Sequence, residues 1–232
     1  EIGVRLVGSE MCIRDSLSSL RNAEEMYVFM SLCTKMPYVL CDEETFDDEV
    51  LLYYTEEDAQ REGKKLIEQR IPIQIAKIEK KQLLGFFSSL YPMGVNGLLI
   101  NNNMESEARL QLGELVIRPN TEDLPDGKVW VENPQLHLTA LYFMQEMRRQ
   151  EKPELTEELK GLQEEILVNY GRGRFIVAVH KENGMPMLKQ KNGDAYQPIF
   201  TDILEFRKFN KEDQFKTCLL YTSDAADDMQ CV

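Results

Sequence analysis

The chain has few basic residues for its acidic content and no long apolar run. Lysine and arginine number 27 against 40 aspartate and glutamate residues, which gives a formal net charge of −13. Nucleic-acid phosphates and anionic lipid headgroups attract basic surfaces, so this balance argues against both partners. No stretch approaches the eighteen or so consecutive apolar residues that a membrane-spanning helix needs. We therefore expect a partner that is neither nucleic acid nor membrane.

Cysteine is also scarce, and most of it lies near the chain ends. Of the five cysteines, Cys12, Cys218 and Cys231 fall within 1–16 and 218–232, which leaves Cys33 and Cys41. Two cysteines in a body of about two hundred residues do not make a disulfide framework. A reducing, cytoplasmic environment is the expected location.

The two ends are predicted to be translated sequencing-library adapters. The codons GAG ATG TGT ATA AGA GAC AG would encode "EMCIRDS" (10–16), and their reverse complement, read one base in, encodes "CLLYTS" (218–223). Protein folding does not select an inverted repeat in DNA. We therefore treat 1–16 and 218–232 as artefacts and leave them out of the fold argument. They hold six acidic and two basic residues, so the net charge of the rest is −9, and we expect any order there to rest on little packing.

The first half of the remaining chain alternates apolar runs with amphipathic segments. Thr55 followed by Asp58 is typical of a helix N-terminus, and alternating Ile71, Ile73 and Ile75 indicate a half-buried strand. Strands are expected at 26–33, 36–41, 50–54, 71–78 and 95–103, the first two as a hairpin, with helices at 55–70, 79–91 and 105–119.

A segment rich in proline and turn residues, 119–133, predicts a linker. Beyond it, helices are expected at 133–150, with Asn133 as its cap, and at 152–170. Short strands at 175–180, 185–190 and 195–200 then precede a helix at 201–209 that Thr201 would cap.

The two halves repeat one order of features. Each has an apolar strand, a Met-Pro pair, a turn, a strand and a capping threonine, and Pro37 precedes Thr55 by 18 residues while Pro186 precedes Thr201 by 15. We therefore predict an α+β protein of two related modules with mixed sheets and helices, 17–118 and 134–217. The second would be incomplete, because the strand expected to begin at 213–217 runs into the terminal artefact.

The segments "FIVAVHKENGMPMLKQKNGDAYQPIFTDILEFRKF" (175–209) and "MGVNGLLINNN" (93–103) resemble the N-terminal domain of the SseB (enhanced serine sensitivity) family of bacterial proteins, in its two-copy form. The resemblance covers most of 26–217 and consists of core and turn features. It implies a cytoplasmic α+β protein of poorly defined role, linked by the family name to serine tolerance, with no catalytic residue to transfer.

The residues themselves indicate no active site, so we assign no catalytic, cofactor-binding or metal-binding residue and expect no cofactor. Cys33 and Cys41 end apolar strands and are interpreted as small hydrophobic residues; the alternative is a thiol nucleophile, although acids at 42–44 would raise a thiol pKa. Arg172 and Arg174 in "GRGR" could hold a phosphate, but a glycine helix stop explains the motif more simply.

The acidic segment 42–49 is interpreted as a solvated hairpin tip rather than a cation site. His137 and His180 have no cysteine or carboxylate at the sequence spacing of a metal site and are interpreted as ordinary residues. The resulting hypothesis is a non-catalytic protein that binds a protein or small metabolite, or regulates an enzyme. The alternatives are a thiol-dependent enzyme that uses Cys41 or Cys33, and a homodimerisation scaffold.

Overall fold

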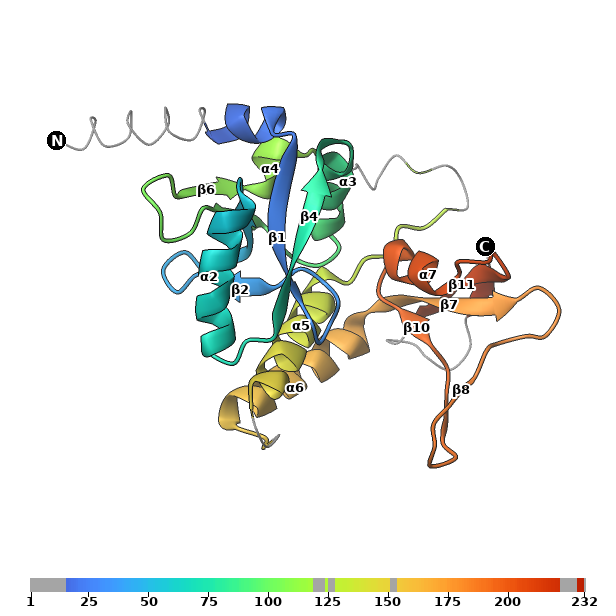
Figure 1. The fold of residues 1–232 in the computed structure, drawn as a ribbon. Helices are drawn as coiled ribbons and strands as arrows, with labels where there is room; N and C mark the ends of the chain where they lie inside the picture. The colour runs from blue at the N-terminus through green and yellow to red at the C-terminus, as the bar shows by residue number, and fades with distance from the viewer. Residues whose placement is uncertain (1–15, 119–123, 125–127, 151–153, 222–228, 232) are drawn as a thin grey trace. The chain divides into compact units, whose positions relative to one another are not determined.

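The computed structural model describes residues 16–118, 124, 128–150, 154–221 and 229–231 (Figure 1). It has an α+β fold that divides into two compact units. Unit 1 comprises 1–118 and 141–160, and unit 2 comprises 119–140 and 161–232. Helices α5 (Pro134–Arg149) and α6 (Glu157–Arg172) each contribute residues to both units. The adapter prediction for 1–15, 222–228 and 232, and the linker prediction for 119–123 and 125–127, lie outside the described residues.

Unit 1 is built on a mixed six-stranded sheet. Its main path runs β4-β1-β3-β5-β6, with β2 paired to β3, and only the β3–β5 pair is parallel. The strands are β1 (Glu25–Ser31), β2 (Val39–Cys41), β3 (Asp48–Tyr53), β4 (Ile73–Glu79), β5 (Gly97–Ile100) and β6 (Ala108–Gln111). The helices are α2 (Glu56–Glu68), α3 (Lys80–Leu90) and the single turn α4 (Leu112–Leu115), and 16–22 are also helical.

Both faces of strand β1 are buried. Alternate residues point to opposite faces of a strand, and Met26 and Val28 are as inaccessible as Tyr27 and Phe29. The Tyr27 and Phe29 face packs with Ala59 of α2 in one apolar cluster, while α3 also packs on β1 and β4. Figure 1 shows α2 and α3 flanking these two strands.

The end of helix α5 covers the free edge of β2. The side-chain amide of Gln145 donates from Nε2 to the Val39 carbonyl at 2.9 Å, and its Oε1 accepts the Val39 N–H at 3.2 Å. The Tyr142 hydroxyl donates to Asp48 at 2.5 Å. These bonds replace part of the pairing that an edge strand lacks.

Most of the predicted elements of unit 1 are present, with two errors. Thr55 does cap α2, accepting the Asp58 N–H. The predicted hairpin closes only at its turn, where Met30 bridges Pro37, and β2 then pairs with β3 instead of β1. The helix predicted at 105–119 is wrong, because β6 pairs with β5 there and only α4 is helical.

Unit 2 has a four-stranded sheet in the order β10-β7-β11-β12 and a separate hairpin, β8–β9. Its strands are β7 (Arg174–His180), β8 (Leu188–Lys189), β9 (Ala195–Tyr196), β10 (Ile199–Phe200), β11 (Phe215–Tyr221) and β12 (Met229–Cys231), and α7 (Ile203–Phe209) follows β10. The core cluster comprises Val131, Ile176, Ala178, Phe200, Phe206 and Leu219. Val131 shows that the end of the predicted linker packs into this unit.

Asn133 precedes helix α5, as predicted, but its side chain does not cap it. The amide Nδ2 donates to the carbonyls of Arg174 at 2.6 Å and Thr201 at 2.7 Å, and Oδ1 accepts the Arg174 N–H at 3.2 Å. One side chain thereby joins the start of β7 to the end of β10. The cap predicted at Thr201 is wrong by one residue, because Asp202 accepts the N–H groups of Leu204 and Glu205.

The two sheets share one pairing pattern. In unit 1, β1 lies between β4 and β3, both antiparallel to it, and in unit 2, β7 lies between β11 and β10 in the same way. This pattern is what an internal repeat requires, and the repeat itself stays a prediction.

Strand β11 continues past residue 217 into the segment predicted to be an artefact. Cys218 is 1% and Leu219 6% exposed, and both pair with β7. The expectation of little packing is wrong for these two residues. Cys218 is disulfide-bonded.

Candidate functional site

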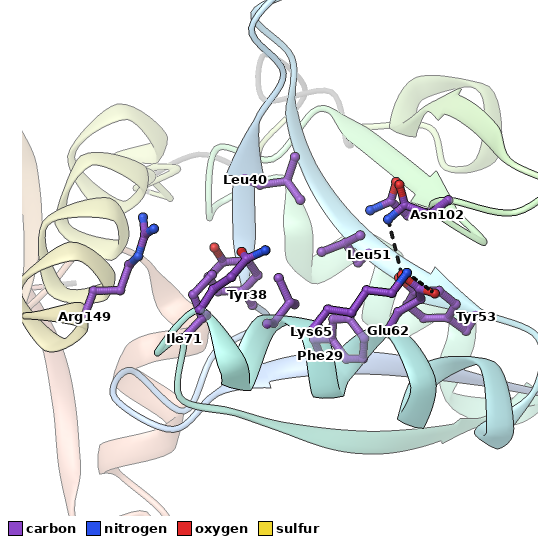
Figure 2. A pocket seen from close by; sticks show the side chains of 13 residues that line it. Phe29, Tyr38, Leu40, Leu51, Tyr53, Glu62, Lys65, Ile71, Asn102 and Arg149 are labelled. Carbon is purple, nitrogen blue, oxygen red and sulfur yellow. Dashed lines mark hydrogen bonds and ion pairs between the residues drawn. The ribbon is translucent and has the colours of Figure 1, made fainter.

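The candidate site is a pocket of about 360 Å³ within unit 1 (Figure 2). It lies between helix α2, the strands β1, β2 and β3, the turn after β5 and the end of α5. Its lining residues are Phe29, Tyr38, Leu40, Leu51, Tyr53, Glu62, Lys65, Leu66, Gln69, Ile71, Asn102, Asn103 and Arg149. This volume is within the range of small-molecule sites in proteins.

The pocket wall formed by the sheet is apolar. Phe29, Leu51 and Ile71 belong to the buried cluster that α2 covers, and Leu40 and Leu66 pack against that cluster. This surface suits the hydrocarbon part of a ligand.

A buried carboxylate forms the polar side of the pocket. Glu62 is 4% exposed and accepts from Lys65 Nζ at 2.9 and 2.7 Å and from Asn103 Nδ2 at 3.2 Å. Burial alone would raise the pKa of Glu62, but its bonds to Lys65 and Asn103 lower it below the usual value. Glu62 is therefore ionised at neutral pH, and its oxygens are already bound.

Asn103 lies in a turn that follows strand β5, within the segment 95–103 that was predicted to be a strand. Asn101 and Asn103 have φ values of 49° and 64°, a left-handed conformation that asparagine tolerates better than most residues. The Asn101 side chain stabilises the turn by accepting the Tyr54 N–H at 3.3 Å and donating to Ser106 at 2.9 Å.

Tyr53 lines the same pocket with an unsatisfied hydroxyl. The residue is fully buried, and its hydroxyl has no hydrogen-bond partner among the described residues. Burial, reinforced by the charge of Glu62, strongly raises the pKa of Tyr53. The group is therefore a neutral donor with nothing to receive its proton.

Two cationic side chains lie at the pocket rim. Lys65 is half-exposed and Arg149 is exposed, and Figure 2 shows Arg149 on the α5 side and Lys65 beside Glu62. Burial raises the pKa of Tyr38, and the nearby Arg149 opposes that rise. Both cations already have a carboxylate partner, because Lys65 pairs with Glu62 at 2.7 Å and Arg149 pairs with Glu146 at 3.3 Å.

The sequence candidates Cys33 and Cys41 lie outside the pocket lining. Both thiols are free, and Cys41 is exposed while Cys33 is partly buried. Burial, with the charges of Asp48 and Asp42, raises the pKa of Cys41, which reduces its thiolate fraction at neutral pH.

Arg172 and Arg174 lie where helix α6 ends and strand β7 begins. Arg172 lies in the last turn of α6, which continues through Gly171, so the predicted stop there is wrong by a residue or two. The Arg174 guanidinium lies 5.5 Å from the centre of the Tyr221 ring. A Cβ at Gly173 would lie 2.5 Å from the Phe175 ring, so this glycine allows close packing.

The acidic segment 42–49 is only partly a solvated tip. Asp42 accepts the N–H groups of Glu44 and Thr45 and pairs with Arg109 of β6. The bond from the Thr45 N–H is the main cause that lowers the pKa of Asp42 to about 2, and Arg109 adds to it. Glu49 is 2% exposed, and burial raises its pKa. The solvated interpretation is wrong for these two acids.

The interpretation of His137 as an ordinary residue stays a prediction, although the fold gives it neighbours that sequence spacing did not indicate. The fold brings it to Asp202 and Glu205, with His137 Nδ1 at 3.6 Å from Asp202 Oδ2. These residues are 65 and 68 positions away in sequence, so no local spacing could reveal the group. His180, in contrast, accepts the N–H groups of Glu182 and Asn183.

Comparisons with known proteins identify no family. No protein-family model matches the chain, and no curated protein is significantly similar to it. Among solved structures, Tic22 from Plasmodium falciparum shares 17% identity over 90% of this chain and 84% of its own, with a TM-score of 0.24. A value that low supports no conclusion about fold or function.

Within the part of the chain that the structure describes, no helix is both long and apolar enough to cross a membrane.

Proposed function

We propose that this protein is a non-catalytic, SseB-like binding protein whose unit 1 pocket takes a small metabolite, and that occupancy of the pocket regulates a partner. The buried, unsatisfied hydroxyl of Tyr53 in the pocket lining carries this proposal.

The energetic argument concerns the cost of that hydroxyl. A buried polar group without a hydrogen bond costs about 1–3 kcal/mol. Glu62 is already bound by Lys65 and Asn103, so within this pocket a ligand acceptor is the natural partner for Tyr53. Binding would recover the cost of the unsatisfied group.

The chemistry of the lining defines the ligand class. The wall of Phe29, Leu51 and Ile71 suits an apolar body, and the Tyr53 hydroxyl suits a carbonyl or carboxylate oxygen. The guanidinium of Arg149 pairs with Glu146 through Nη1 and has further N–H donors that can bind a ligand carboxylate. A small carboxylic acid with a hydrocarbon or aromatic side chain fits all three features. Amino acids and 2-oxo acids belong to this class.

Cellular context comes from the sequence resemblance. In this proposal the protein acts in a bacterial cytoplasm, in agreement with the free thiols of Cys33 and Cys41; the disulfide-bonded Cys218 belongs to the segment attributed to an adapter. The raised pKa of Cys41 argues against the alternative of a thiol-dependent enzyme.

The test uses Tyr53→Phe, which removes the hydroxyl and keeps the ring. Without ligand, we expect this variant to melt at the same or a higher temperature, because an unsatisfied group is lost. Its affinity for the best ligand from a panel of aliphatic and aromatic amino acids and 2-oxo acids, measured by calorimetry, should fall about tenfold, the equivalent of one hydrogen bond.

Tyr54→Phe is the matched control. The Tyr54 hydroxyl is also buried without a hydrogen-bond partner among the described residues, but Tyr54 is not part of the pocket lining. It should affect melting as Tyr53→Phe does and leave ligand affinity unchanged. Equal affinities of the two variants, or no binding from the panel, would reject the proposal.

A further inference from the structure

We infer that unit 2 contains a site for a divalent transition-metal ion, formed by His137, Asp202 and Glu205. The inference is independent of the unit 1 pocket.

The three ligands come from two helices. His137 lies in the first turns of α5, Asp202 is the N-cap of α7, and Glu205 lies in the first turn of α7. One ligand atom from each lies within 4.8 Å of the other two. His137 and Asp202 are buried and Glu205 is partly buried, so the group is shielded from bulk water on most sides.

The imidazole of His137 provides the observation that points to a ligand. The residue is 9% exposed, and its Nδ1 is buried without a hydrogen-bond partner in the described part of the chain. At 3.6 Å, Nδ1 is too far from Asp202 Oδ2 for a hydrogen bond. A buried, unsatisfied ring nitrogen that faces a carboxylate is a costly arrangement for a protein that binds nothing there.

The separation of these two atoms suits a shared ion. If both lie about 2.0–2.2 Å from one metal, a 3.6 Å separation corresponds to an angle of roughly 110–130° at that metal, close to tetrahedral. Glu205 is the least buried of the three, and one oxygen of its carboxylate lies within 4.8 Å of the other two ligand atoms. A water molecule would complete a four-coordinate site.

The carboxylates of Asp202 and Glu205 can bind a metal ion and keep their hydrogen bonds within the protein. Asp202 Oδ1 caps α7 by accepting the N–H groups of Leu204 and Glu205, whereas Oδ2 accepts from the Thr201 hydroxyl at 2.8 Å. Lys208 Nζ binds Glu205 Oε1 at 2.5 Å, so Oε2 is the oxygen available to an ion.

The donor set selects the kind of ion. Mg²⁺ and Ca²⁺ prefer oxygen ligands alone, whereas one imidazole with two carboxylates suits Zn²⁺ and neighbouring first-row divalent ions. Zn²⁺ is therefore the probe. By joining the start of α5 to the start of α7, it would stabilise unit 2 as any ligand that binds only the folded state does.

The experiment is a calorimetric titration of the full chain with Zn²⁺ at neutral pH, with Mg²⁺ as the negative control. We expect one Zn²⁺ per chain and a rise in melting temperature. Loss of a residue that only hydrogen-bonds to a metal ligand weakens metal affinity roughly 10–100-fold. His137→Ala and Glu205→Gln each remove a ligand itself, so each should weaken Zn²⁺ binding by more than that.

Asp202→Asn separates metal binding from folding. Asparagine caps helices as well as aspartate does, so α7 should remain intact, as circular dichroism can check, while Zn²⁺ affinity falls. Two matched controls should bind Zn²⁺ normally: His180→Ala, which removes the other histidine, and Cys33→Ser/Cys41→Ser, which removes the free thiols.

A second measurement remains valid if a variant fails to fold. With two histidines in the sequence, nitrogen-15 spectra of the imidazoles can be assigned by elimination, and Zn²⁺ should shift Nδ1 of His137 and leave His180 unchanged. Absence of stoichiometric binding, binding that survives His137→Ala, or an imidazolium form of His137 paired with Asp202 at neutral pH would each overturn the inference.

Discussion

Units 1 and 2 share the pairing of three strands and differ in how the third strand is held. In unit 1 the strand β3 has six residues and pairs with β1, β2 and β5. In unit 2 the equivalent strand β10 has two residues and two register pairs with β7. Asn133 supplies the missing backbone bonds by linking Arg174 to Thr201. A unit with little pairing along one strand therefore depends heavily on one side chain.

The largest expected effect comes from removing that side chain. Asn133→Ala removes the hydrogen bonds that its side chain donates to the part-buried carbonyls of Arg174 and Thr201, and we expect a loss of about 3 kcal/mol in the unfolding free energy of unit 2. Hydrogen exchange resolved by segment should show faster exchange in β7 and β10 and little change in β1 and β4. Uniform loss of protection in both units would contradict the assignment of this residue to unit 2.

Glycine substitutions should have opposite signs in the two units. A Cβ at Gly173 would meet the Phe175 ring at 2.5 Å and Asn133 Oδ1 at 2.8 Å, so Gly173→Ala should cost about 1–3 kcal/mol. A Cβ at Gly63 would meet Phe29 and Ile73 at an ordinary 3.4 Å. Because Gly63 is inside helix α2, Gly63→Ala should stabilise unit 1 by about 0.5–1 kcal/mol. Urea unfolding of each variant tests both signs, and destabilisation by Gly63→Ala would show that the sheet cannot accept the methyl group.

The side-chain amide of Gln145 should contribute less to the stability of unit 1 than that of Asn133 contributes to unit 2. Gln145→Ala removes two bonds to Val39, but Gln145 is only partly buried and water can replace it. We expect a loss of about 1 kcal/mol, measured by the same urea unfolding. Gln150→Ala, which removes an exposed glutamine bond to Glu154, is a control that should have no measurable effect. If Gln145→Ala lowered the free energy of unfolding as much as Asn133→Ala does, the two units would not differ in their dependence on one side chain.

The last expected effect concerns acid. The pKa of Asp42 is lowered to about 2 in the folded chain, against about 3.9 when unfolded. Its stabilising contribution is therefore present above about pH 4 and is lost as the pH falls towards 2. The stability difference between the parent chain and Asp42→Asn should shrink over that interval, as followed by urea midpoints at several pH values. A difference that does not change with pH would show that Asp42 has the same pKa in the folded and the unfolded chain.

Local features of the sequence predicted local structure well. The Thr55 cap and the alternating isoleucines of β4 depend on neighbours within a few residues, and both are present as expected. The segment 105–119 failed because Leu110 and its neighbours are held by pairing with β5, a contact that a helical pattern does not reveal. Thr201 failed as a cap because Asp202, one residue later, provides the better acceptor.

The candidate sites could not be predicted from spacing. Tyr53 and Glu62 are separated by one helix cap and two turns of α2, and nothing local marks the Tyr53 hydroxyl as unsatisfied. His137 meets Asp202 only because β7, β10 and α7 fold back on the start of α5. The sequence contains two histidines, and the structure alone shows that one of them, His137, is buried beside an acid.

The two hydrogen bonds between the Gln145 side chain and Val39 of β2 also affect self-association. An open strand edge offers its N–H and C=O groups to a strand of another molecule, which is the first step in domain exchange and fibril growth. Gln145 occupies both groups of Val39 with a side chain that cannot extend the sheet further. Unit 1 therefore blocks addition of a strand at this edge with a helix, and loss of one glutamine would expose a template for aggregation.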